Sequence, residues 1–106
     1  METLITRLQG GPHPVIAARD ENTAALVDSL RRGFVLLRFE HTRGGTELGI
    51  QLDPTTCDPT PSALTPADVQ MHLVGDLSLD GRAVRCIIDL DLKTLRGWGK
   101  IALREH

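Results

Sequence analysis

The chain has 106 residues, of which 41% are hydrophobic and 25% are charged, and its formal net charge is −2. Leu, Ile, Val and Phe account for 30 residues, enough for one core, so a single domain over residues 1–106 is expected and a disordered polyelectrolyte is excluded. The 14 acidic residues outnumber the 12 basic ones, and no stretch approaches the ~18 apolar residues of a membrane span. We therefore expect neither a nucleic-acid-binding protein nor a membrane protein.

The N-terminal part of the chain predicts two short strands separated by a connector. Residues 3–8 and 15–18 carry the apolar side chains of such strands. The segment 9–14 between them is rich in Gly and Pro, which break regular structure, so it is expected to be a flexible connector.

A helix is predicted next, running to about Arg32. Asp20 or Asn22 can cap its start, and Gly33 can end it in the left-handed conformation. The spacing of three and four residues predicts one narrow apolar stripe that suits packing against a sheet, formed by Thr23, Leu26, Val27 and Leu30.

Residues 34–40 and 46–53 are predicted to pair as a hairpin, because the Gly-Gly pair between them accepts the positive φ of a tight turn. Such a turn places Arg43 opposite Thr46. Phe39 then faces Ile50 and Leu37 faces Leu52, so that all four apolar side chains share one face of the sheet.

The segment 53–68 is predicted to be a connecting loop, since proline excludes it from a sheet interior. Its prolines are Pro54, Pro59, Pro61 and Pro66. Cys57 lies in this loop and Cys86 in an expected core strand, so the two cysteines indicate neither a disulfide framework nor a thiolate metal site. Residues 1–14 lack the order of charged and apolar residues of a signal peptide, and a cytoplasmic protein is expected.

The most regular pattern in the chain is the alternation over residues 69–79 and 82–92 around Asp80-Gly81, a preferred two-residue turn. A turn there places Leu79 opposite Arg82. The apolar pairs that follow are Leu77 with Val84, Leu73 with Ile88, Met71 with Leu90 and Val69 with Leu92, while Gly75 falls opposite Cys86. Residues 98–103 are expected to add an edge strand.

Together these elements predict an α+β domain with two layers. A mainly antiparallel sheet of five to six strands would carry one main helix on one face, leaving its second face open.

The register of the second hairpin also predicts the residues of that open face. His72 falls opposite Asp89, Asp76 opposite Arg85, and Val74 opposite Ile87 as an apolar island. With Arg38 from the first hairpin, the candidate binding residues are Arg38, His72, Val74, Arg85, Ile87 and Asp89. An apolar patch ringed by polar groups is typical of an interaction surface, so we expect a non-enzymatic accessory or regulatory protein. Its partner would be another protein or a second copy of this chain, bound through the open face or the edge strand.

The alternative is a small enzyme or small-ligand-binding protein of a biosynthetic pathway, with His72 as general base and Asp89 orienting its ring. The same two residues could equally be a stabilising cross-strand pair, and no Ser or Cys nucleophile lies beside His72 in this register. Asp91 could join them in a metal site, but no recognised metal-ligand spacing occurs, so neither a metal nor a cofactor is expected. Trp98, flanked by glycines, either covers the core or marks a contact surface.

Overall fold

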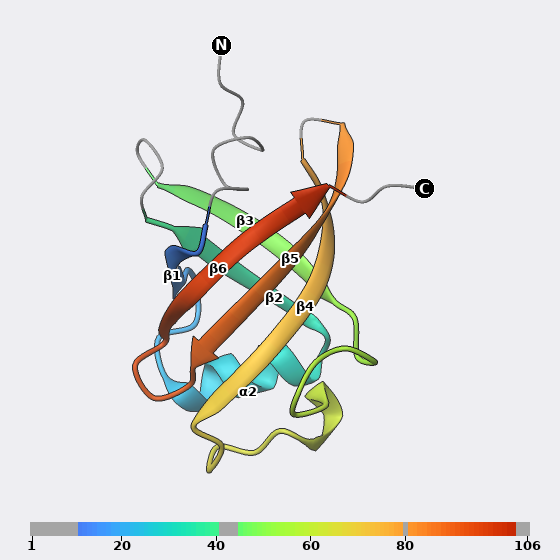
Figure 1. Ribbon diagram of the computed structural model, residues 1–106. Helices are drawn as coiled ribbons and strands as arrows, with labels where there is room; N and C mark the ends of the chain where they lie inside the picture. Colours follow the sequence, from blue (N-terminus) through green and yellow to red (C-terminus); the bar gives the residue numbers. More distant parts are fainter. Residues whose placement is uncertain (1–10, 41–44, 80, 104–106) are drawn as a thin grey trace.

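The computed structural model describes residues 11–40, 45–79 and 81–103 of the chain, which form six strands and one α-helix (Figure 1). The expected strand at residues 3–8 lies outside the described residues. The elements in chain order are β1 (His13–Ala17), α2 (Thr23–Arg31), β2 (Phe34–Phe39), β3 (Thr46–Leu52), the 3-10 turn η1 (Pro61–Ala63), β4 (Gln70–Leu79), β5 (Arg82–Asp91) and β6 (Arg96–Leu103). His13 and Pro14 of the expected connector thus belong to β1.

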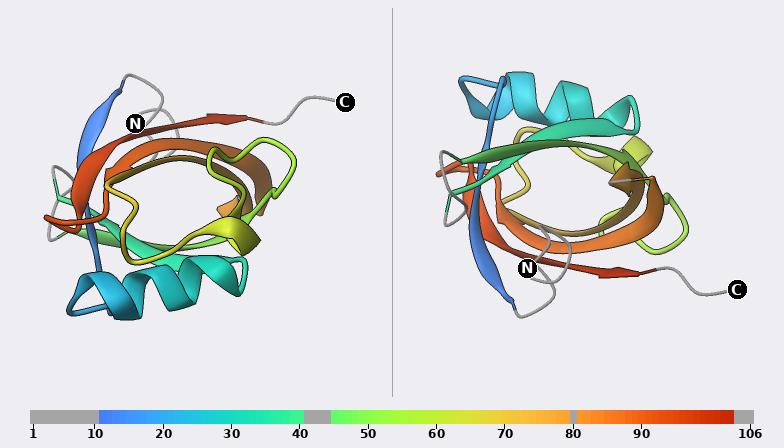
Figure 2. Two further views of the ribbon diagram at one scale, coloured as in Figure 1. Left: turned by 90° about the horizontal axis from the view of Figure 1, so that it is seen from below. Right: turned by 90° about the horizontal axis from the view of Figure 1, so that it is seen from above.

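The six strands close into an antiparallel barrel with the order β1-β2-β3-β4-β5-β6, and β1 pairs with both β2 and β6 (Figure 2). The prediction of an open two-layer α+β sheet is therefore wrong. Because the sheet closes on itself, its apolar face encloses the core and its other face becomes the outside of the barrel. The strand predicted at 98–103 forms as part of β6, which pairs with β5 over its whole length and with β1 only at residues 96–99, so the predicted edge has a second neighbour at Trp98 and Gly99.

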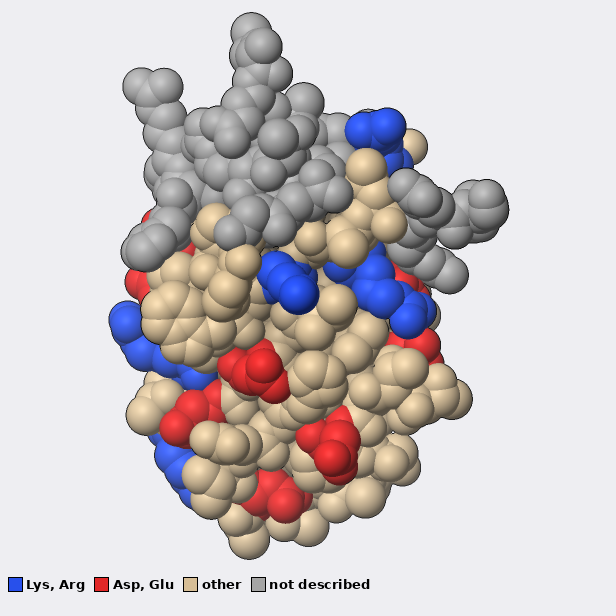
Figure 3. Space-filling view, in the orientation of Figure 1, with Lys and Arg blue, Asp and Glu red and all other residues tan. Residues whose placement is uncertain are grey.

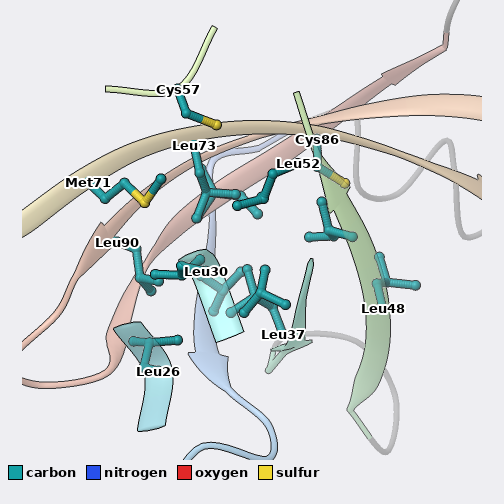
Figure 4. Packing of buried hydrophobic residues seen from close by; sticks show 14 of the residues in the cluster. Leu26, Leu30, Leu37, Leu48, Leu52, Cys57, Met71, Leu73, Cys86 and Leu90 are labelled. Carbon is teal, nitrogen blue, oxygen red and sulfur yellow. The ribbon is translucent and has the colours of Figure 1, made fainter. Parts of the chain in front are cut away.

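Helix α2 lies at one end of the barrel, beside β2 and η1, rather than across a sheet face (Figures 1 and 2). Asn22 is the cap, its side chain accepting a hydrogen bond of 2.9 Å from the Ala25 N–H, and Gly33 has the predicted positive φ of 87°. The predicted stripe is buried at Leu26, Val27 and Leu30. The side chains of the helix point into the cluster formed by the strands, with Leu26 and Leu30 beside Leu37 and Leu90 (Figure 4).

The hairpin of β2 and β3 forms, but its predicted register is wrong. Phe39 lies opposite Thr46, and Leu37 opposite Leu48 rather than Leu52. The shift is four residues, an even number, so every apolar side chain keeps its predicted face and Phe39, Leu37, Ile50 and Leu52 are all buried. Alternation alone cannot distinguish registers that differ by an even number of residues.

The hairpin of β4 and β5 has the predicted register throughout, from Leu79 opposite Arg82 to Met71 opposite Leu90. Val69 lies just before β4. It still pairs with the partner strand as predicted, because the Leu92 N–H donates a hydrogen bond of 2.7 Å to the Val69 carbonyl. The close approach expected at Gly75 is also present. A Cβ there would meet the Ile50 side chain and would lie 2.6 Å from the Gln51 carbonyl oxygen.

The start of the Pro-rich segment continues along the outside of β4 after β3 has ended. The Asp53 N–H donates to the Val74 carbonyl at 2.8 Å, and Asp58 and His72 exchange two backbone hydrogen bonds of 2.8 Å. Between these points the Cys57 thiol lies 3.4 Å from both the N–H and the carbonyl of Val74. Cys57 is therefore buried beside the backbone of β4, where it belongs to the core cluster (Figure 4).

Candidate functional site

A row of six side chains crosses the outer surface of the barrel at one level. His72 of β4 lies opposite Asp89 of β5, which lies opposite Trp98 of β6, which in turn lies opposite Pro14 of β1. Asp58 extends the row beyond His72, and Glu40 extends it beyond Pro14 through a backbone hydrogen bond of 3.1 Å. We call these residues the outer row: Asp58, His72, Asp89, Trp98, Pro14 and Glu40.

The outer row lines a groove of about 760 Å³. Trp98 lies near its middle and is 56% exposed, although it is the largest side chain of the protein. The strand residues next to the row in sequence, such as Val15, Met71 and Leu90, point into the core. The alternation of β4, β5, β6 and β1 therefore directs the row outward and fixes its spacing.

His72 and Asp89 meet as the hairpin register predicts. Nδ1 of His72 is 2.8 Å from Oδ1 of Asp89, which leaves Nε2 as the second hydrogen-bonding atom of the ring. Both side chains are exposed, with 45% of His72 and 76% of Asp89 accessible. The arrangement orients the imidazole, as a general base requires, but it does so on the surface and not in an enclosed pocket.

The predicted pair of Asp76 and Arg85 also forms, and a third residue joins it. Nε of Arg85 is 3.2 Å from Asp76, and its terminal nitrogen is 3.2 Å from Asp53. The Asp76 carboxylate, with Asp53 beside it, raises the pKa of the Arg85 guanidinium above its ordinary value. This cluster ties the segment after β3 to β5 and leaves Arg85 engaged within its own chain.

Three other predicted binding residues lie away from the groove. Val74 is only 7% exposed, with its backbone hydrogen-bonded to the segment 53–58, and Ile87 lies between Val74 and Lys100 in the strand register. Arg38 lies on β2, where it pairs with Glu47 at 3.0 Å. The expected apolar island is thus closed over by the protein itself, and only His72 and Asp89 of the predicted set line the groove.

Residues of the β5–β6 turn border the groove. Oδ1 of Asp91 accepts hydrogen bonds from the N–H groups of Lys93 at 2.7 Å and Thr94 at 3.0 Å. Arg96, the first residue of β6, reaches across to Glu40 with a separation of 3.6 Å. The groove thus already holds one guanidinium against a carboxylate.

Neither cysteine is suited to act as a nucleophile. Burial raises the pKa of the Cys86 thiol to about 12, and burial also raises the pKa of Cys57. Within residues 11–40, 45–79 and 81–103, no three His, Cys, Asp or Glu side chains gather closely enough to hold a metal ion. His72, Asp89 and Asp91 therefore do not form the metal site considered from the sequence. No helix in the same ranges has the length and apolar character needed to cross a bilayer.

No protein-family model matches this sequence, and no curated protein matches it. The case for a function therefore rests on the geometry of the groove and on the chemistry of its residues.

Most residues of the groove carry no direct signal in the amino-acid sequence. Pro14, Glu40 and Asp58 belong to segments whose neighbours are set by barrel closure. Trp98 could have been placed beside Asp89, because an Asp carboxylate commonly accepts the backbone N–H group two residues later in a turn, as Asp91 does with Lys93. Pairing Asp91 with Arg96 across that turn brings Trp98 opposite Asp89.

The carboxylates of Asp53 and Asp91 have lowered pKa values, so we expect the stability of the fold to decrease at acidic pH. Hydrogen bonds from Thr55 lower the pKa of Asp53, with Arg85 contributing, and the Thr94 and Lys93 N–H groups lower the pKa of Asp91. Each folded-state pKa lies below the ordinary value of an aspartate, so the stabilisation is present above that value and is lost as the pH falls through the folded-state pKa values. We expect the urea midpoint to decrease between about pH 5 and about pH 2.5.

The matched variant for this prediction is Asp53→Asn with Asp91→Asn, in which neither position titrates. Its urea midpoint should change less than that of the wild type over the same pH range. An equal decrease in the two proteins would show that other groups cause the acid sensitivity.

Proposed function

We propose that this chain is a small non-catalytic binding module that holds a protein partner in the groove along the outer row. The observation that carries the proposal is Trp98, more than half exposed in a groove of about 760 Å³. Tryptophan is enriched among the residues that dominate binding energies, since its indole buries a large area and loses little conformational entropy. The volume lies in the range of about 300–1,000 Å³ that accepts a short segment or a small molecule.

Because the strands form a closed barrel, we expect a partner to bind on its outer surface. Every strand has two neighbours over at least part of its length, which limits the edge open to a partner strand, and Val74 of the predicted apolar island is itself buried. The groove can take a segment of another protein or of a second copy of this chain. We propose a cytoplasmic setting, which the two free, buried thiols support.

A library of random peptides displayed on phage tests the proposal. Peptides selected on the wild-type chain should bind with dissociation constants near about 1–100 μM and should lose at least about tenfold in affinity with Trp98→Ala. Phe34→Ala is the matched control, because Phe34 is an aromatic side chain of similar exposure, 48%, that does not line the groove. Selected peptides that ignore Trp98→Ala, or that respond equally to Phe34→Ala, would refute a function in this groove.

The second candidate is a small enzyme or small-ligand-binding protein, which the 2.8 Å contact between His72 and Asp89 favours. Against catalysis, both thiols are buried, and the groove is an open channel on the barrel surface. His72→Gln separates the two candidates. In a binding module, His72 is one of six residues of the outer row, so the affinity for the selected peptides should fall by about two- to tenfold, whereas loss of a catalytic base should cost about 100-fold or more in rate.

A further inference from the structure

We propose that the groove takes an extended segment of a partner protein that carries Lys or Arg, with the cationic group on the Trp98 indole beside Asp89. This inference rests on the proposed binding function and specifies the chemistry of the partner. It follows from three features of the groove: its uncompensated carboxylates, the position of Trp98 between its neighbours, and the length of the outer row.

Two carboxylates of the outer row have no cationic partner of the Lys or Arg type among the described residues. Asp89 is 76% exposed and contacts only His72, which carries charge only when it is protonated. Asp58 lies on the other side of His72, held there by its two backbone hydrogen bonds. The other acidic groups of the groove are engaged, Glu40 with Arg96 and Asp91 with two backbone N–H groups. Acidic side chains also gather on the lower half of this face, over β4 and β5 (Figure 3).

Trp98 lies next to Asp89, one of the two carboxylates without a Lys or Arg partner among the described residues. Directly opposed residues of neighbouring strands have Cβ atoms about 4.5–5.5 Å apart, so a cation on the indole face is within reach of Asp89. Tryptophan is the aromatic residue that binds cations most strongly through its ring face. Pro14, on the other side of Trp98, offers an apolar surface for the methylene groups of a Lys or Arg side chain.

The length of the row favours a chain segment over an isolated cation. Its six residues lie on six neighbouring backbone segments, and a spacing of about 4.8 Å per segment gives a row of about 24 Å. An extended peptide of about seven or eight residues has this length. An isolated cation would contact only one position along it, and the acidic groups are not arranged as a metal site in the part of the chain that the structure describes.

The chain contains one Trp and no Tyr, so its intrinsic fluorescence reports on the groove alone. The probes are peptides of about eight residues, with a shared Gly-Ser background, that carry a pair of Arg, a pair of Gln or a pair of Glu. The Arg peptide should shift the Trp98 emission and bind at least about tenfold more tightly than the Gln peptide, and the Glu peptide should give no saturable change. Added salt should weaken the binding of the Arg peptide.

The variant Asp89→Asn should weaken the Arg peptide by at least about fivefold and leave the Gln peptide unchanged. Glu21→Gln is the matched control, because it removes the same charge from an exposed residue outside the groove, and it should change the affinity by less than about twofold. Circular dichroism of each variant establishes that it is folded.

The outcomes separate this inference from the proposed function. Equal binding of the Arg, Gln and Glu peptides, each with a shift in Trp98 emission, would leave the groove a peptide site and overturn the assignment of a basic partner. Arginine amide that binds as tightly as the Arg peptide would overturn the extended segment in favour of a small cation. If none of the three peptides changes the emission while phage-selected peptides do, the basic partner is refuted and the binding function stands. If selected peptides also fail to respond to Trp98→Ala, both are refuted.

Discussion

Gly97→Ala is expected to destabilise the protein by about 3 kcal/mol, at the upper end of the usual cost of overpacking. Gly97 lies opposite Leu90 where β6 crosses β5, and a Cβ on it would collide with the Asp89 carbonyl oxygen and lie 2.9 Å from the Cα of Leu90. Both obstacles are backbone atoms, so relief requires the two strands to separate. Urea unfolding followed by circular dichroism measures the loss.

Gly49→Ala is the matched control for Gly97→Ala, because it introduces the same methyl group into another strand of the barrel. Its Cβ would lie 2.9 Å from the end of the Phe34 ring, which is 48% exposed and can move aside. We expect a loss of less than about 1 kcal/mol. Similar losses in the two variants would contradict the close approach of β5 and β6, which also sets the spacing of Asp89 and Trp98 in the groove.

Leu30→Ala is expected to cost about 2–5 kcal/mol in unfolding free energy, the range for removing a fully buried leucine side chain. Leu30 is completely buried in the cluster formed by the strands, and α2 supplies it at the end of the barrel. The helix is thus an integral part of the core although it contacts only one end of it. Thermal or urea unfolding gives the free energy directly.

Asp28→Ala, on the exposed side of the same helix, serves as the control for Leu30→Ala. It removes an ion pair of 2.8 Å with Arg32 between side chains that are both largely exposed, so the loss should be below about 0.5 kcal/mol. A loss below about 1 kcal/mol for Leu30→Ala would mean that α2 does not close the barrel end. Leu30→Ala should leave the fluorescence response of Trp98 to peptides unchanged under conditions where the variant is folded, since Leu30 does not line the groove.

Local patterns in the sequence determined the helix, the hairpin of β4 and β5 and the contact between His72 and Asp89. An Asp-Gly turn and two uninterrupted alternating strands leave only one register that buries all the apolar residues, and that register places the imidazole opposite the carboxylate. The register of β2 and β3 was not determined in this way. Its longer connection permits any even shift, and all of these shifts bury the same side chains.

Only the tertiary structure decided that the sheet closes and where the groove lies. Alternation records which side chains point inward, but it does not specify which strand edges meet. Closure of the barrel depends on the pairing of His13–Ile16 with residues 96–99, about eighty positions later in the chain. The contact of the segment 53–58 with Val74 and His72 depends on that segment running back along β4. Both arrangements are long-range backbone pairings, which carry no local side-chain pattern. Pro14 and Asp58 join His72, Asp89 and Trp98 for this reason alone.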